Sequence, residues 1–219
     1  MILRRSFLSS LGAAIALKPP SAPAQSGARG PWQPARHAED DWLDEIPGKH
    51  RIVFDTTTPE GFGAAMFYGS NFLDTNKNAY GLEYSDVALV IIARHNSTSF
   101  AYNDAMWAKY GSIFTQRTKL NDPKTKEPPK TNLYNTAGGG LSNNGVTLDA
   151  LVKRGAHLAV CRLATRNLAG LVASSTGSTA DKVNEELIAN IITNAHMVPA
   201  GIVAMSRAQE RGYTFAHGV

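Results

Sequence analysis

The sequence AHLAVCRLATRNLAGL, residues 156–171, contains the features that decide the fold. Its first part, Leu158–Val160, is a short apolar run that predicts a buried strand ending at Cys161, the only cysteine in the chain. Helically spaced apolar residues, beginning with Ala164 and Leu168, follow without an intervening turn. Open α/β sheets place their ligands and chemistry at the carboxyl ends of their strands. We therefore expect Cys161 to lie at the chemically important edge of such a sheet.

The rest of the chain alternates between strand and helix patterns in the same way. The strongest strand pattern, Asp86–His95, is apolar on both faces, as expected of a central parallel strand. We predict further strands over 50–56, 157–161, 195–199 and 213–217, and helices over 61–76, 100–110, 147–154, 180–194 and 201–212 and directly after the cysteine. This alternation predicts an α/β fold, a three-layer α/β/α sandwich on a mainly parallel sheet of about five strands.

The first 24 residues have the pattern of a twin-arginine export signal. Arg4–Leu8 is the twin-arginine motif, Ser9–Leu17 is weakly apolar, and Ala22–Ala24 has the small residues that a signal peptidase requires. Cleavage is expected before Gln25, which places the mature protein in the periplasm. A basic amino terminus without a targeting role is the alternative.

The remaining chain divides into an arm and one domain. Residues 25–48 are rich in proline, glycine and charge, and we expect an arm that is partly ordered by Trp32, Trp42 and Leu43. Residues 49–219 form the predicted α/β domain, with a small-residue linker over 174–179. Residues 115–145, rich in proline, lysine and glycine, are predicted to be a long inserted loop, which in a compact domain is functional, disordered or an interaction element.

Charge and hydropathy exclude two classes of partner. The chain has 22 Lys and Arg against 18 Asp and Glu, but three of the bases and none of the acids lie in residues 1–24. The mature chain therefore has 19 bases for 18 acids, and this near-neutral balance gives no reason to expect nucleic acid as a partner. No apolar stretch approaches the roughly 18 residues that span a bilayer, so no membrane association is expected after signal cleavage.

Cys161 has two interpretations that the residues alone leave open. A free cysteine is mostly protonated at neutral pH, so a catalytic cysteine needs nearby positive charge. The start of the following helix, together with Arg162 and Arg166, would supply that charge. In the other interpretation Cys161 is a buried, inert side chain that acts as a small hydrophobic residue. As the single cysteine, it forms no disulfide within the chain.

Two other segments are candidate parts of a site. His95 ends the strongest strand, so a parallel sheet would place it at the same edge as Cys161. There it would act as a base or as a group that orients the thiol. The alternative is that His95 caps the next helix. Gly138–Gly145, GGGLSNNG, is either an anion-holding turn or a flexible one. It lacks the lysine of a phosphate-binding loop and the glycine spacing of a dinucleotide fold. No cofactor is therefore predicted.

No metal site is predicted either. His157, His196 and His217 have neither helical spacing nor accompanying cysteines, so the sequence has no zinc signature. A histidine site assembled in space remains open. The chain also lacks the Gly-x-Ser-x-Gly turn of a serine hydrolase.

Several segments together resemble the DsrE/DsrF-like sulfur-relay family, in which a strand presents a cysteine before a helix. The resemblance covers roughly residues 50–217 and rests on Gly155–Cys161 with Ala164 and Arg166, on the strand Val87–Ala93, and on the closing pattern Val198–Gly201 and Ala208–Tyr213.

This resemblance implies that Cys161, and Cys161 alone, bears a persulfide and passes sulfane sulfur between partners. Our first hypothesis adds His95 and Arg166 as supporting groups, from their expected positions near the thiol. The partner would be a protein or small molecule with a thiol or sulfane sulfur, and the protein would be a homo-oligomer. The alternatives are a non-catalytic periplasmic oligomer that binds a small ligand or a metal, and a structural oligomer in which Cys161 is inert. Whether the protein is an enzyme is left open.

Overall fold

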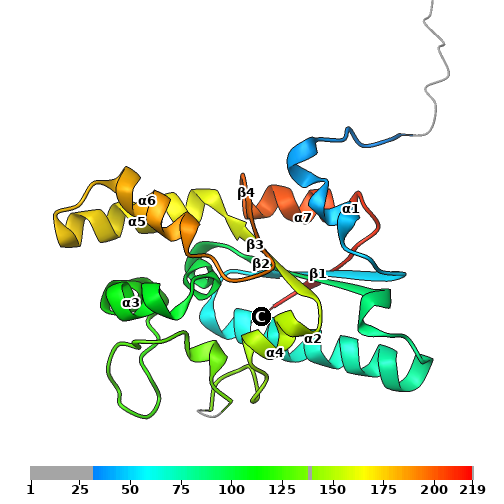
Figure 1. Ribbon diagram of the computed structural model, residues 1–219, viewed down its shortest axis with the longest axis horizontal. Helices are drawn as coiled ribbons and strands as arrows, with labels where there is room; N and C mark the ends of the chain where they lie inside the picture. The colour runs from blue at the N-terminus through cyan, green and yellow to red at the C-terminus, as the bar shows by residue number, and fades with distance from the viewer. Residues whose placement is uncertain (1–31, 138–139, 219) are drawn as a thin grey trace, which may run out of the picture. The chain divides into compact units, whose positions relative to one another are not determined.

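The computed structural model describes residues 32–137 and 140–218. The chain divides after Pro34 into two units, and the description below concerns the second, which begins at Ala35. Its described residues form one sheet of five parallel strands in the order β4-β3-β2-β1-β5 (Figure 1). The strands are β1 (His50–Thr56), β2 (Val87–Ala93), β3 (Ala156–Cys161), β4 (Ala195–Val198) and β5 (Thr214–His217).

Helices pack on both faces of this sheet, so the predicted three-layer α/β/α sandwich is confirmed (Figure 1). The α-helices are α1 (Trp42–Glu45), α2 (Pro59–Tyr80), α3 (Asp104–Thr118), α4 (Leu148–Lys153), α5 (Arg162–Thr176), α6 (Ala180–Ala189) and α7 (Gly201–Gln209). Short 3-10 helices are η1 (Ala38–Asp40), η2 (Tyr84–Asp86), η3 (His95–Ala101) and η4 (Leu133–Asn135). Helices α2 to α6 contribute to the core around Leu89 and Leu158, whereas α1 and α7 enclose a second core around Val90 and Ala159.

The strand order explains why α7 lies on the face opposite to α2–α6. The chain moves across the sheet in one direction from β1 to β4 and then returns past β1 to β5. Because crossovers between parallel strands are right-handed, reversing the direction moves the connecting helix to the other face. As a result α5 and α7, which follow the neighbouring strands β3 and β4, begin at the same carboxyl edge from opposite faces of the sheet.

The predicted loop 115–145 begins later than expected and is packed against the domain. Helix α3 continues to Thr118, because its buried face includes Ile113 and Phe114, and a left-handed residue, Lys119, ends it. Beyond it, the buried Asn132 donates from its amide to the carbonyl oxygens of Phe100 and Tyr102. The described part of this loop is therefore a fixed element of the fold.

The helix boundaries around α5 and α6 differ from the prediction for local reasons. The linker expected over 174–179 is largely the last turn of α5, because the hydroxyl groups of residues 174–176 donate to carbonyl oxygens one turn earlier and Gly177 ends the helix with a φ of 70°. The helix expected to reach residue 194 ends at Ala189. Asn190 then accepts a hydrogen bond from Asn103, and Ile191 pairs with Tyr102 in an isolated bridge.

The predicted export signal, residues 1–24, lies outside the described residues. Part of the predicted arm belongs to the domain, because Leu43 and Ile46 are buried in the second core. The guanidinium of Arg51 donates hydrogen bonds to the carbonyl oxygens of both residues. The hydroxyl of Tyr213 also donates to the carbonyl oxygen of Leu43. The folded unit therefore starts before residue 49.

Candidate functional site at the carboxyl edge of the sheet

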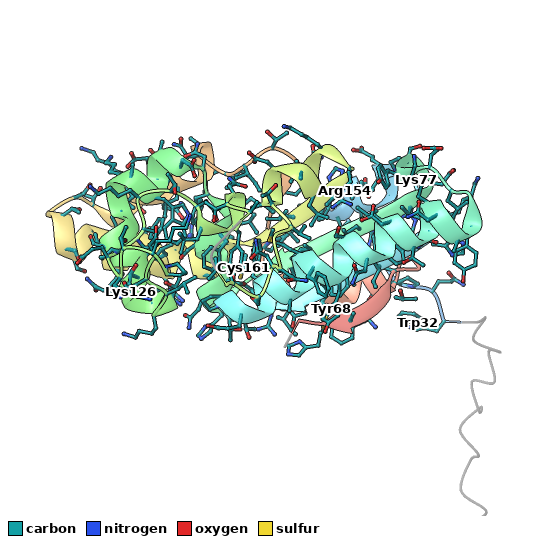
Figure 2. All side chains as sticks on the ribbon, turned by 90° about the horizontal axis from the view of Figure 1, so that it is seen from below. Trp32, Tyr68, Lys77, Lys126, Arg154 and Cys161 are labelled. Carbon is teal, nitrogen blue, oxygen red and sulfur yellow. The ribbon has the colours of Figure 1, made fainter. Side chains whose placement is uncertain are left out.

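Cys161 is the last residue of β3 and the residue from which α5 starts. Its side chain is only 7% exposed, and its sulfur has no hydrogen-bond partner among the described residues. Figure 2 labels its position among the side chains of the domain. The strand is buried and no loop separates it from the helix, so the thiol is held at the carboxyl edge, where the sequence predicted it.

A shallow depression of about 230 Å³ opens over Cys161. It is lined by residues from the ends of β2 and α3 and from the first turns of α5 and α7: Arg94, His95, Arg117, Cys161, Leu163, Ala164, Asn167, Ala200, Gly201 and Ile202. None of these lining residues, all in the described part of the chain, is an aspartate or glutamate. The wall of the depression is therefore cationic and partly apolar.

Arg94 is held in place by the buried carboxylate of Asp55. Its Nε and one Nη donate to the two carboxylate oxygens of Asp55, each at 2.7 Å, in the two-pronged geometry that favours arginine. Asp55 is 3% exposed, so the pair crosses from β1 to the end of β2 inside the protein. The hydrogen bonds to Asp55 raise the pKa of Arg94, with a smaller contribution from the Cys161 sulfur nearby. Arg94 is a fixed cation whose charge is largely balanced.

Arg117 is the second guanidinium in the depression. It lies in the last turn of α3 and is half-buried, and no acidic side chain pairs with it among the described residues. Arg117 is not among the site residues expected from the sequence, because residue 117 falls inside the predicted loop. Its position at the end of an amphipathic helix whose buried face extends to Thr118 is the signal that would have located it.

His95 lies where the sequence placed it, at the end of β2 and beside Cys161 in the depression. It is exposed, and its backbone has a φ of 56°, a left-handed conformation that is uncommon for residues other than glycine. This turn starts η3 and redirects the chain across the carboxyl edge. The predicted alternative, capping of the next helix, falls to another residue, because Asn103 caps α3 by accepting from the N–H of Met106.

Arg166 and Arg162 do not line the depression. Both are exposed on α5, whereas the lining residues of that helix are Leu163, Ala164 and Asn167. The two arginines lie on a neighbouring stripe of the helix, as expected for residues four apart. The supporting role predicted for Arg166 stays a prediction, and the guanidinium groups that the structure places at Cys161 belong to Arg94 and Arg117.

A buried hydrogen-bond chain fixes the backbone beneath the thiol. Tyr102 donates its hydroxyl to Thr165 at 2.9 Å, and the Thr165 hydroxyl donates to the carbonyl oxygen of Cys161 at 3.0 Å. Both side chains are fully buried. Burial raises the pKa of Tyr102 well above its usual value, so its phenol stays neutral. This chain ties the first turn of α5 to η3 and holds Cys161 in one position.

Two of the scattered histidines meet away from this edge. His157 Nδ1 lies 2.9 Å from His196 Nε2, and Trp42 stacks on His196 with ring centroids 4.0 Å apart. Burial, together with the neighbouring His196, lowers the pKa of His157 to about 4. Burial also lowers the pKa of His196, although the negative charge of Glu45 acts to raise it. The pair is thus neutral at neutral pH and joins β3, β4 and α1.

The remaining candidates do not join the depression. His217 lies at the end of β5, where its Nδ1 is 4.0 Å from Asp55. Of the glycine-rich segment, residues 138 and 139 lie outside the described residues, and Ser142 donates to the carbonyl oxygen of Glu60 at the start of α2. Within the described ranges, no group of three or more histidine, cysteine or acidic side chains is arranged to hold a metal ion.

Comparisons with protein-family models, with curated proteins and with solved structures give no match. The helices of the described residues include none with the length and hydropathy to cross a bilayer. The family expected from the sequence therefore remains a proposal. The geometry offers a single thiol at a strand end, beside one balanced and one unbalanced guanidinium, and this arrangement suits nucleophilic chemistry on an anionic or polarised substrate.

Proposed function

We propose that this protein is an exported DsrE-like sulfur carrier that binds and transfers sulfane sulfur through a persulfide on Cys161. The observation that supports this most is the position of the only cysteine. It ends the buried strand β3 at the start of α5, in a depression that Arg94 and Arg117 also line. A structural cysteine needs none of these neighbours.

The transfer would take place in two balanced steps. The Cys161 thiolate attacks a sulfane sulfur, a new S–S bond forms, and the old bond breaks with its electron pair on the leaving group. The thiolate of an acceptor then attacks the outer sulfur of the persulfide, which restores the Cys161 thiolate. Arg94 and Arg117 stabilise negative charge on both thiolates, and His95, at the rim, accepts or returns a proton.

A partner protein would reach Cys161 through the apolar rim of the depression. Leu163 and Ile202 line it, are 58% and 52% exposed, and belong to the first turns of α5 and α7. Exposed apolar side chains gathered beside a reactive group suit transient docking. We also propose a periplasmic location, from the signal pattern in the sequence, and a homo-oligomeric state, from the family resemblance; cell fractionation and native mass spectrometry test them.

The experiment is sulfur loading of the signal-free protein. The protein is treated with inorganic polysulfide, desalted, and its intact mass is measured beside that of a Cys161→Ser variant. We expect a gain of one sulfur atom in the wild type only, which a small thiol acceptor removes. The same gain in both proteins, or in neither, would refute the proposal.

A second candidate function, a ligand-binding module, is favoured by a different cavity. This cavity of about 780 Å³ is lined by polar side chains that include Asp104, Asp149 and Lys153, at the amino end of α3 and along α4. Under this alternative, native mass spectrometry of protein isolated from its own periplasm would show a bound small molecule, and Cys161→Ser would retain it.

A further inference from the structure

A second cavity lies beside α3 and α4, and it is separate from the depression over Cys161. Its volume of about 780 Å³ is within the range of cavities that hold small molecules. Its wall is formed by the start of α3, by η4, by α4 and by the segment that leads into β4. No residue that lines it also lines the depression over Cys161. The cavity is therefore a candidate site in its own right.

Three charged side chains in this wall have no ion-pair partner among the described residues. Asp149 and Lys153 are four residues apart on α4, the spacing at which oppositely charged side chains pair on a helix, yet they do not pair with each other. Asp104, at the start of α3, accepts the backbone N–H of Asn132 through one carboxylate oxygen and has no cationic partner. The cavity therefore offers two carboxylates and one ammonium group to a ligand.

An apolar strip completes the wall. Val152 of α4, together with Ile191 and Ile192 after α6, lines the cavity, and all three side chains are partly buried against the core. A ligand with an apolar group would remove this strip from water, which is favourable. A ligand that is only polar would gain nothing from it.

Hydrogen bonds hold the elements of the wall in place before a ligand arrives. The amide of Asn103, at the start of α3, donates to the side chain of Asn190 at 3.0 Å. Asn135, in η4, accepts from the backbone N–H of Asp149 at 3.1 Å. Because these elements are already connected, a ligand has little of the wall to reorder, and the entropic cost of binding is reduced.

The combination of charges disfavours the simpler classes of ligand. A metal ion would be repelled by Lys153, and the described residues contain no group of three or more histidine, cysteine or acidic side chains arranged to hold one. A simple anion would face two carboxylates, and a simple cation would leave Lys153 without a partner. An uncharged polyol would leave all three charges unpaired. A ligand that has both charges matches the wall best.

We infer that this cavity binds a small zwitterion with an apolar side chain, that is, a free amino acid of the leucine type. Its ammonium group pairs with Asp104 and Asp149, its carboxylate pairs with Lys153, and its side chain covers the apolar strip. The inference does not depend on sulfur transfer at Cys161, and it names a ligand class for the second candidate function.

The first test is isothermal titration calorimetry of the purified protein with four compounds. L-Leucine has both charges and the apolar side chain. Isoamylamine lacks only the carboxylate, 4-methylpentanoate lacks only the ammonium group, and glycine lacks only the side chain. We expect each of these three to bind about three- to tenfold more weakly than leucine, because each loses one interaction and the ion pairs remain partly in water.

The second test assigns binding to this cavity. Asp149→Asn and Lys153→Gln each remove one charge from the wall. Asp181→Asn and Lys182→Gln are the matched controls, because both residues are exposed on α6 and outside the cavity. Asp181, like Asp149, lies two residues after a threonine that caps its helix. The affinity for leucine should fall about threefold or more in the two cavity variants and stay unchanged in the controls and in Cys161→Ser.

Absence of leucine binding to the wild type would overturn the inference, and so would equal affinities for leucine and its two single-charge analogues. An equal effect in the cavity variants and their controls would overturn the assignment to this cavity. Loss of leucine binding in Cys161→Ser would also overturn it, because the ligand would then lie over the thiol. The proposed sulfur transfer is judged separately, by sulfur loading of Cys161.

Discussion

Replacing Asp55 by asparagine removes the counter-charge that fixes Arg94 at the candidate site. Asparagine keeps one acceptor oxygen but loses the ion pair and one of the two 2.7 Å bonds. Removing one partner of a fully buried ion pair costs about 3–5 kcal/mol. The Arg94 side chain is 27% exposed, so water compensates part of its charge, and we expect the free energy of unfolding to fall by about 2–3 kcal/mol.

Urea unfolding at pH 7, followed by the fluorescence of the three tryptophans, measures this loss. The matched control is Lys49→Gln, which breaks the exposed ion pair between Lys49 and Asp86. Exposed pairs contribute little, so this control should change stability by less than about 1 kcal/mol. If Asp55→Asn proves as stable as the control, the Asp55–Arg94 pair does not hold the edge of the sheet as described.

Three further perturbations test the packing that supports the site. The pKa of His157, about 4, lies below that of a histidine in the unfolded chain, so the unfolded chain binds the proton first and stability falls as the pH drops from about 6.5 to 4. For this half-buried group we expect a loss of roughly 1–2 kcal/mol, measured by urea unfolding at each pH, and the His157→Gln variant should lack it. The same pH profile in the variant and the wild type would contradict this. Gly111→Ala places a methyl group against the carbonyl oxygen of Pro129 and should lower the free energy of unfolding by about 2 kcal/mol or more. Gly170→Ala, in open space on α5, should instead raise it by about 0.5–1 kcal/mol. Calorimetry measures the melting temperature of both variants, and equal values would contradict this. Tyr134→Phe removes a buried hydroxyl that donates to the carbonyl oxygen of Pro59, the first residue of α2, and should cost about 1–2 kcal/mol in urea. No loss of stability would mean that this hydroxyl does not hold the inserted loop.

The sequence predicted what depends on local pattern. The apolar runs of β1, β2 and β3 and the direct passage from Cys161 into α5 were sufficient to predict the sheet class and the location of the thiol. The periodicity of a strand or helix and the position of its end are both properties of neighbouring residues, which explains why these predictions were confirmed.

The composition of the site was less predictable, because it depends on which elements meet. Arg166 is close to Cys161 in sequence but lies on another stripe of α5, whereas Arg117 is distant in sequence and reaches the depression at the end of α3. His157 and His196 are 39 residues apart and meet only because β3 and β4 are neighbours in the sheet. No single-sequence pattern specifies such encounters.

The most direct test of the account is the alkylation rate of Cys161 in the folded, signal-free protein, compared with that of the same chain in denaturant at the same pH. A buried structural cysteine reacts only after unfolding, because the reagent cannot reach it. A thiol that carries sulfur is both reachable and partly ionised, although it is only 7% exposed at rest. We expect the folded protein to react with iodoacetamide at least as fast as the unfolded chain. A thiol that stays unreactive until denaturant is added would contradict it.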